Sequence, residues 1–385
     1  MRTVYFIYGS FSPNSASNNR ALAYLNALSK LEYKVSVIYL MPDAKRSRMT
    51  EEYPGITVTY CWDKGYHKGR ISKYFSYIKY LFNIYKAIKP GDIVYLYGEV
   101  DLLILLSHKK GVHIFHERTE HPAVLPPKGH VFNPSLKTYL NYCRKIDGLF
   151  VISTCLRSYF IEKGVDADKV VIVNSVVDTS RFDSLVKQNV EPYFAYCGNG
   201  NNRKDKVDEL IKVFSRVASR HSDIKFYIIG PTKQVYKDEE DNVQLVHELG
   251  LDDRVIFTGM KPAREVPQLL VNATALFLTR PDTLQNRAGF STKLGEYLAS
   301  GNPVVAAGVG DIPLYLKDRE NAFVFEPGDF NSVEEAMEDI LAHPETAKII
   351  GLAGEKTADT YFNSFIETKK LVMAFDSIGL RNKDL

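Results

Sequence analysis

The sequence contains few cysteines and no long apolar run. Four cysteines occur in 385 residues (Cys61, Cys143, Cys155 and Cys197), and none stands in a CxxC pair or at a zinc-site spacing from histidine. This pattern predicts reduced, buried thiols rather than a disulfide framework or a zinc site. No stretch of 18 apolar residues is present, so no transmembrane helix is predicted. We therefore expect a cytoplasmic protein.

A large net charge is also absent. The formal net charge is +3, and the chain is 45% hydrophobic and 25% charged, which is typical of globular proteins. The charge is uneven, because residues 1–190 carry +10 and residues 191–385 carry −7. A basic half predicts an anionic partner, although an uneven surface charge without function is the alternative. Without a recognised nucleic-acid module, we expect no nucleic-acid partner.

Short apolar runs alternate with helical patterns along the whole chain, which is typical of parallel βαβ units. The length suits two domains, and the polar stretch 187–192, which ends in proline, predicts the linker. The expected strands cover residues 4–8, 34–39, 93–97, 113–116, 149–152 and 170–173, then 193–197, 225–229, 255–258, 275–278, 304–306 and 322–325. The expected helices cover residues 20–30, 73–88, 136–145, 207–218, 265–272, 292–300 and 333–342.

The segment 288–301 predicts a loop that leads into a helix. Ser291 or Thr292 can cap the helix start, which leaves backbone N–H groups to hold an anion. Gly301 ends the helix, and Glu296 lies about one turn inside it. A phosphate at this helix start, with a sugar hydroxyl beside Glu296, is what a nucleotide sugar would need. An ordinary helix–strand unit is the alternative.

A second candidate segment follows the strand 193–197. There the chain runs through Gly198 and Asn199 into a basic loop, with Arg203 and Lys204 just before a helix. Fixed cations near a helix start suit a diphosphate. A solvated basic loop is the alternative.

Together these segments resemble the donor side of retaining glycosyltransferases of family 4, the glycosyl transferases group 1, which have the GT-B fold. The match covers residues 140–330 well and the first 140 residues more loosely. It implies an α/β chain of two Rossmann-like domains with parallel sheets facing across a cleft. The acceptor-side domain would cover residues 1–188, the nucleotide-sugar domain residues 189–361, and a helix over residues 362–385 would cross back to the first domain.

The resemblance also assigns roles on the donor side. Glu296 would hold the donor ribose, and Lys204, helped by Arg203, would act on the departing diphosphate. The other expected donor-binding residues are Gly198, Asn199, Gly230, Thr258, Gly259, Phe290, Ser291, Thr292 and Lys293.

In the first domain, His116 and Glu117 stand where an expected strand ends and would therefore lie at the cleft edge. We expect His116 to be catalytic, with a structural histidine as the alternative. Glu117, and Ser10 in the loop after the first strand, would lie on the acceptor side.

Several positions depart from the family pattern. Asn199 replaces an arginine, and Lys206 stands where a glycine often follows the lysine. The pattern also has two acids seven residues apart, and the first falls on Ala288. Its loss leaves the sugar to backbone groups and to neighbours such as Arg287 or Lys293. It indicates a different donor, or weak or absent activity.

The resemblance implies a metal-independent, hexosyltransferase-type enzyme without a cofactor. It would move a sugar from a nucleotide-diphosphate sugar to a sugar or lipid-linked acceptor, with retention, in surface polysaccharide or glycolipid biosynthesis. A nucleotide-sugar epimerase of similar fold and a catalytically silent nucleotide-sugar binder are the alternatives. The basic, aromatic segment 68–82 predicts peripheral contact with an anionic inner-membrane surface. A core-facing helix with lysines on its wet face is the alternative.

Overall fold

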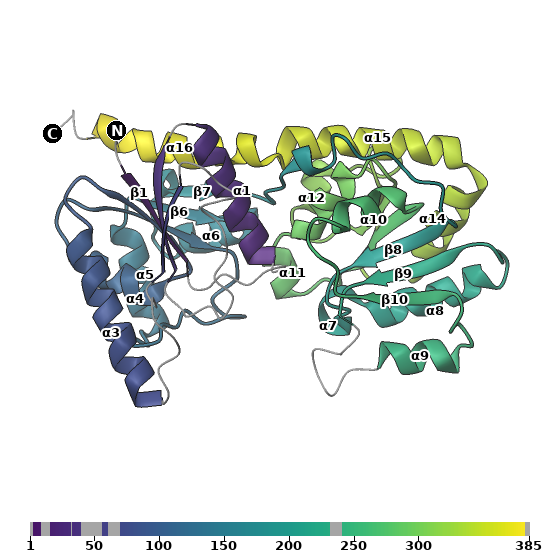
Figure 1. Cartoon of the computed structure of the whole chain (residues 1–385), viewed down its shortest axis with the longest axis horizontal. Coiled ribbons are helices and arrows are strands. Elements are labelled where there is room, and N and C mark those ends of the chain that lie inside the picture. Colours follow the sequence, from purple (N-terminus) through teal and green to yellow (C-terminus); the bar gives the residue numbers. More distant parts are fainter. Residues whose placement is uncertain are drawn as a thin grey trace. The chain divides into compact units, whose positions relative to one another are not determined.

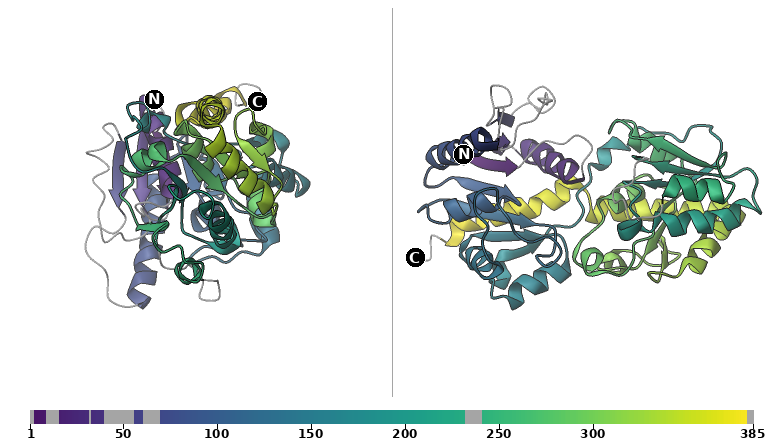
Figure 2. Two further views of the ribbon diagram at one scale, coloured as in Figure 1. Left: turned by 90° about the vertical axis from the view of Figure 1, so that its right-hand side faces the viewer. Right: turned by 90° about the horizontal axis from the view of Figure 1, so that it is seen from below.

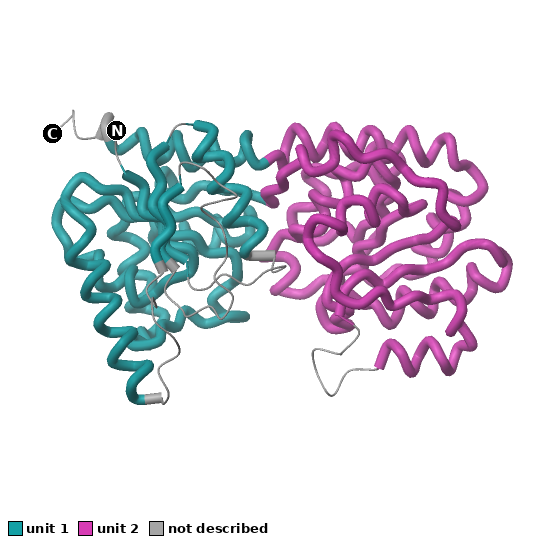
Figure 3. Tube along the Cα trace, viewed as in Figure 1, with its two compact units in different colours: residues 1–174, 364–385 teal, residues 175–363 magenta. Residues whose placement is uncertain are grey.

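The computed structural model of the chain describes residues 3–8, 16–31, 33–39, 56–60, 70–231 and 241–381. The chain divides into two compact units (Figure 3). The first unit contains residues 1–174 and 364–385, and the second contains residues 175–363. Both units are α/β (Figure 1), as the alternation of apolar runs and helical patterns predicted.

The described strands of the first unit form a seven-stranded parallel sheet in the order β3-β2-β1-β4-β5-β6-β7. The central strands, such as β4 and β6, are apolar runs buried on both faces, as parallel strands covered by helices must be. The strands are β1 Thr3–Tyr8, β2 Lys34–Tyr39, β3 Ile56–Tyr60, β4 Ile93–Tyr97, β5 His113–Arg118, β6 Gly148–Val151 and β7 Val170–Ile172.

Helices connect these strands, and α1 packs against α16, which comes from the far end of the chain. One internal clamp fixes the loop that follows β5. The Asp101 carboxylate accepts hydrogen bonds from the backbone N–H of His130 and Phe132 and from the Tyr77 hydroxyl. The helices are α1 Ala16–Lys30, α3 Arg70–Ala87, α4 Val100–Leu106, α5 Leu136–Lys145, α6 Thr154–Glu162, the 3₁₀ turn η1 Ala167–Lys169 and α16 Ser364–Arg381.

The described strands of the second unit form a six-stranded parallel sheet in the order β10-β9-β8-β11-β12-β13 (Figures 1 and 2). Its core joins the sheet to α8, α9 and α14 through side chains such as Phe214, Phe226 and Met337. The strands are β8 Tyr193–Cys197, β9 Lys225–Ile229, β10 Val255–Gly259, β11 Ala275–Leu278, β12 Val304–Ala307 and β13 Phe323–Phe325.

The helices of the second unit lie between these strands and after them. They are η2 Thr179–Arg181, α7 Asn202–Asp205, α8 Val207–Ala218, α9 Asn242–Glu248, α10 Val266–Asn272, α11 Leu284–Ala288, α12 Thr292–Ala299, α13 Ile312–Tyr315, α14 Phe330–Ala342 and α15 Pro344–Tyr361.

The N-terminal segment of the first unit ends at Asn174, whereas the expected boundary was residue 188. Residues 175–188 pack on the second unit, where Gln188 donates its backbone N–H to the Asn272 side chain at 2.9 Å and the Val186 carbonyl accepts from Gln268. The polar stretch 187–192 is therefore attached to α10 by hydrogen bonds and does not link the units.

Candidate functional site

The strand order of the second sheet reverses between β8 and β11, and ligands of such sheets bind at the carboxyl ends of the strands beside this point. Gly198 follows β8, Gly230 follows β9, and Gly259 ends β10. The backbones come very close here, because a Cβ on Gly230 would lie 1.9 Å from the Gly198 carbonyl oxygen. The predicted glycines therefore share one edge of the sheet.

Helix α12 begins with a side chain that does not cap it. Ser291 stands at the N-cap with extended backbone, but its hydroxyl makes no bond to the helix. That hydroxyl is buried, and among the described residues it has no hydrogen-bond partner. A helix start with orphan N–H groups and an unsatisfied hydroxyl is suited to hold an anion.

Glu296 lies in the same helix and is held by a basic residue that the sequence did not reveal. Arg181 of η2 donates to a Glu296 carboxylate oxygen at 2.7 Å and to the Ala263 carbonyl at 2.7 Å. Both side chains are partly exposed. The pair fixes one carboxylate oxygen of Glu296. Sequence reasoning could not find it, because Arg181 lies 115 residues before Glu296.

A buried charge cluster adjoins the start of α12. The Asp205 carboxylate, at the end of α7, contacts Lys293 Nζ, Arg280 Nε at 3.1 Å and the Tyr196 hydroxyl at 2.6 Å. Burial alone would raise the pKa of Asp205, but Lys293 and Arg280 outweigh it and lower that pKa well below its usual value. Asp205 is therefore a buried anion. Sequence reasoning missed Asp205 and Arg280. Residues 205, 280 and 293 are far apart in the sequence, so no local motif connects them.

The two predicted diphosphate cations lie on the short helix α7. The Asn201 side chain caps α7 by accepting from the Lys204 backbone N–H at 2.9 Å, and the Lys204 carbonyl accepts from Asn286. The Arg203 side chain is exposed, and that of Lys204 is partly buried. Asn199 lies between β8 and this helix. Their action on a diphosphate stays a prediction.

The remaining donor-side predictions fall at the loop before α12 and at the end of β10. Phe290 is nearly buried and packs against Tyr315 and Phe362, with ring centroids 5.8 and 5.4 Å away. The Thr258 hydroxyl bonds to the Gly259 carbonyl at 3.0 Å. Ala288 ends α11 and is fully buried, so its side chain supplies no acid at this place.

In the first unit, His116 and Glu117 lie within β5, not after it, because the strand continues to Arg118. His116 is fully buried, and its Nε2 lies 3.0 Å from the Tyr139 hydroxyl. Burial, helped by Arg118, lowers the pKa of His116 to about 3, so the imidazole is neutral. His116 is therefore buried and neutral in the described conformation, and its catalytic role stays a prediction.

Glu117 is likewise buried, in an ion pair with Arg20 at 2.6 Å. Arg20 also donates to the Val173 carbonyl at 2.6 Å, so the pair ties β5 to α1 and to the end of β7. The Glu117 carboxylate therefore has no exposed surface that a sugar acceptor could contact in the described conformation. Ser10, the other expected acceptor-side residue, lies outside the described residues.

The described ranges offer neither a metal site nor a membrane span. In that part of the chain, no three His, Cys, Asp or Glu side chains gather where they could hold a metal ion. None of the described helices combines the length and apolar character needed to cross a membrane.

Comparison with known proteins agrees with this geometry. Residues 178–357 match the family described as Glycosyl transferases group 1. The N-acetyl-alpha-D-glucosaminyl L-malate synthase of Bacillus anthracis is 25% identical over 179 residues, which are 46% of this chain and 43% of that protein. The matched segment thus spans less than half of that relative.

Solved structures match the whole chain at low identity. The structure of Anabaena HepE in complex with UDP-glucose has a TM-score of 0.72 at 15% identity, over 98% of this chain and 100% of the other. Sucrose-phosphate synthase from Thermosynechococcus elongatus has a TM-score of 0.74 at 17% identity, over 99% and 100%. The chain therefore has the GT-B fold, and its residues 178–357 match the glycosyl transferases group 1 family.

Proposed function

We propose that the protein is a glycosyltransferase that moves a sugar from a nucleotide-diphosphate sugar to an acceptor, with retention at the anomeric carbon. The observation that carries this proposal is helix α12. One helix places an uncapped start with the unsatisfied Ser291 hydroxyl about one turn from Glu296, whose carboxylate Arg181 holds. An anion site lies beside a carboxylate that can accept hydrogen bonds from sugar hydroxyls. This arrangement suits the diphosphate and ribose of a nucleotide. UDP-glucose in the HepE structure supports the same class of donor.

The chemistry follows from charge. When the bond between the sugar and the diphosphate breaks, negative charge grows on the leaving group. The partial positive charge at the start of α12, together with a cation beside it, stabilises that charge. We propose that these groups suffice, so that the reaction needs no metal ion. Retention and the hexosyl nature of the donor are carried over from the family resemblance.

Ala288 favours an alternative function without catalysis. A buried alanine in place of the first acid of the family pattern leaves the sugar with fewer contacts. A catalytically silent nucleotide-sugar binder is therefore the second candidate. It would bind nucleotides as the enzyme does but would neither transfer nor hydrolyse the sugar.

A thermal-shift panel of nucleoside diphosphates and nucleotide sugars tests the proposal. A true ligand raises the melting temperature, because it stabilises the folded state by mass action. We expect one base to stand out, and its nucleotide sugar to be consumed when acceptors are supplied. A shift without transfer or donor hydrolysis would favour the silent binder. Epimer formation without an acceptor would favour an epimerase, and no shift with any nucleotide would refute all three.

Helix α3 supports a membrane-associated acceptor. Its inward face buries Tyr77, Leu81 and Ile84, yet apolar side chains also stand on its outer face, where Ile71 is 75% and Phe75 65% exposed. Exposed Ile78 and Phe82 extend this stripe at helical spacing, with Lys73, Lys79 and Lys86 nearby. Apolar side chains flanked by lysines are typical of helices that lie on anionic membranes. We propose that α3 contacts such a surface, which would present a lipid-linked acceptor.

Replacing Lys73 and Lys79 with serine should weaken binding to vesicles that contain anionic lipid. Each lysine near such a surface contributes about 1 kcal/mol, so the loss should be about 30-fold at low salt. Added salt should reduce wild-type binding steeply. Co-sedimentation measures this, with exposed Lys30 and Lys137 of the same unit replaced by serine as the matched control. Equal losses in both variants, or no binding at low salt, would leave a soluble acceptor as the better interpretation.

A further inference from the structure

The buried cluster around Asp205 lies where the second sheet changes direction. Asp205 ends the helix that follows β8, and Thr279 and Arg280 directly follow β11. The Thr279 hydroxyl donates to the Asp205 carbonyl at 2.6 Å, and Arg280 Nε contacts the carboxylate. Asp205 therefore joins the two loops between which a ligand of this sheet would bind.

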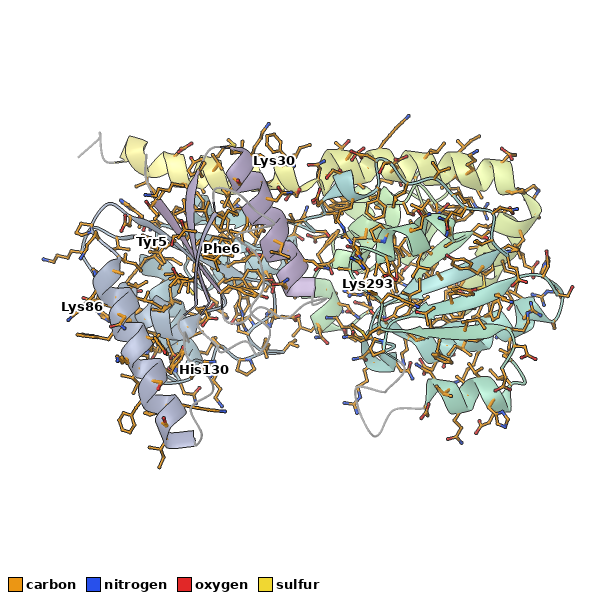
Figure 4. The ribbon with its side chains drawn as sticks, viewed as in Figure 1. Tyr5, Phe6, Lys30, Lys86, His130 and Lys293 are labelled. Atoms are coloured by element: carbon orange, nitrogen blue, oxygen red, sulfur yellow. The ribbon has the colours of Figure 1, made fainter. Side chains whose placement is uncertain are left out.

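Lys293 reaches this cluster from the first turn of α12 (Figure 4). Its Nζ contacts the Asp205 carboxylate and lies 3.1 Å from the Tyr196 hydroxyl, which itself donates to Asp205. The lysine also fills the space beside Gly198, where an added Cβ would lie 2.6 Å from Nζ. The ammonium group is thus held between the loop after β8 and the start of α12.

The cluster has a net positive charge that an anionic ligand could neutralise. Lys293 and Arg280 face a single carboxylate, so the three side chains carry a net charge of +1. An ammonium group has three N–H donors, and Asp205 and Tyr196 use two of those of Lys293. The side chain is 20% exposed although its partner Asp205 is only 3% exposed. One N–H donor of Lys293 therefore remains beyond these two contacts.

From these contacts we propose that Asp205 is a positioning residue, which holds Lys293 as the cation that binds the diphosphate of the donor. The inference rests on the proposed function, because it names the cation beside the anion site of α12. Because Lys293 is largely buried and already paired, its side chain is ordered before a ligand binds. Binding therefore costs little side-chain entropy. It also shares its helix start with the Ser291 hydroxyl. Lys204 and Arg203 would then not be the principal diphosphate ligands.

Asp205 also controls the charge of Lys293. Burial lowers the pKa of Lys293 and the neighbouring Arg280 lowers it further, whereas the Asp205 carboxylate raises it. Removing that carboxylate should therefore move the pKa of Lys293 still lower. Nucleotide binding that needs the charged ammonium would then be lost at a lower pH than in the wild type.

The test measures UDP affinity by calorimetry between pH 7 and 10. Lys293→Met should bind UDP at least 10-fold more weakly than the wild type at pH 7. Asp205→Asn should lose affinity at a lower pH than the wild type as the pH rises. Adding Lys293→Arg to Asp205→Asn should remove this pH dependence, because a guanidinium does not titrate in this range. Lys212→Met is the matched control on α8 and should behave as the wild type.

Circular dichroism checks the folding of each variant. The double variant Lys293→Met and Asp205→Asn serves as a second test in case the single variant Lys293→Met does not fold. The double variant removes the lysine and its counter-charge together, so it should keep a native spectrum while UDP binding stays weak. Wild-type affinity in Lys293→Met, or an unchanged pH profile in Asp205→Asn, overturns the proposal and leaves the proposed function intact. A larger loss in Lys204→Met than in Lys293→Met also overturns it. A wild type that binds no nucleotide contradicts the proposed function itself.

Discussion

A protein with Gly230 replaced by alanine is expected to lose about 3–5 kcal/mol of folding free energy in its second unit. Gly230 has a φ of +153°, a backbone conformation that side chains rarely adopt. Its added Cβ would also lie 1.9 Å from the Gly198 carbonyl oxygen. Either the loop after β8 or the loop after β9 must move. Denaturant unfolding measures the loss, and nucleotide affinity should fall with it.

The matched control is Gly250→Ala in the same unit. Gly250 also has a positive φ, +66°, but no atom lies within 4 Å of its added Cβ. Its replacement should therefore cost only about 1–2 kcal/mol, the conformational term alone. Equal destabilisation by the two variants would mean that the close approach of the two loops does not matter.

The second large effect is expected from Glu296→Ala. If Glu296 accepts hydrogen bonds from the donor ribose, its loss should weaken nucleotide binding by about 1.5–3 kcal/mol, the scale of a hydrogen bond to a charged group. The protein should stay folded, because Glu296 is partly exposed and its removal buries no new charge. Calorimetric titration with UDP measures the change.

Pyrophosphate separates the ribose contact from the phosphate contact, since it has no ribose. Glu296→Ala should bind it as the wild type does. A variant that loses UDP and pyrophosphate affinity together would place Glu296 in the phosphate site or in the support of α12. Arg181→Gln gives a second check, because it removes the ion pair and keeps the carboxylate. It should weaken UDP binding less than Glu296→Ala.

The fold was predictable from local pattern, and so was helix α12. Strands such as β8 and β9 are apolar runs with clear ends, and their observed bounds equal the expected ones. Helix α15 was missed, because Gly351 and Gly354 weaken its helical pattern. The structure explains both glycines, since an added Cβ would meet the Gly301 carbonyl oxygen at 2.5 Å and that of Asn321 at 2.8 Å.

The charges around the candidate site were harder to predict, because they depend on contacts between distant residues. Lys206 has a left-handed backbone with φ 53°, which suits the glycine expected at its position. The residue before it is then Asp205, so a carboxylate stands where the pattern expects a lysine. Asp205 instead brings in Lys293, which is 88 residues away in sequence. A local motif cannot show a cation supplied by another helix.

The first unit is assembled from both ends of the chain, and this imposes an order on its folding. Phe375 of α16 packs on Phe115 with ring centroids 4.7 Å apart, and Glu367 accepts a hydrogen bond from the Asn174 backbone N–H at 3.1 Å. A ribosome makes all the described strands of this unit well before α16. The second unit, continuous in sequence, can fold while the first still exposes the surface that α16 will cover. Until that helix is made, we expect the nascent first unit to expose this apolar surface to chaperones and proteases.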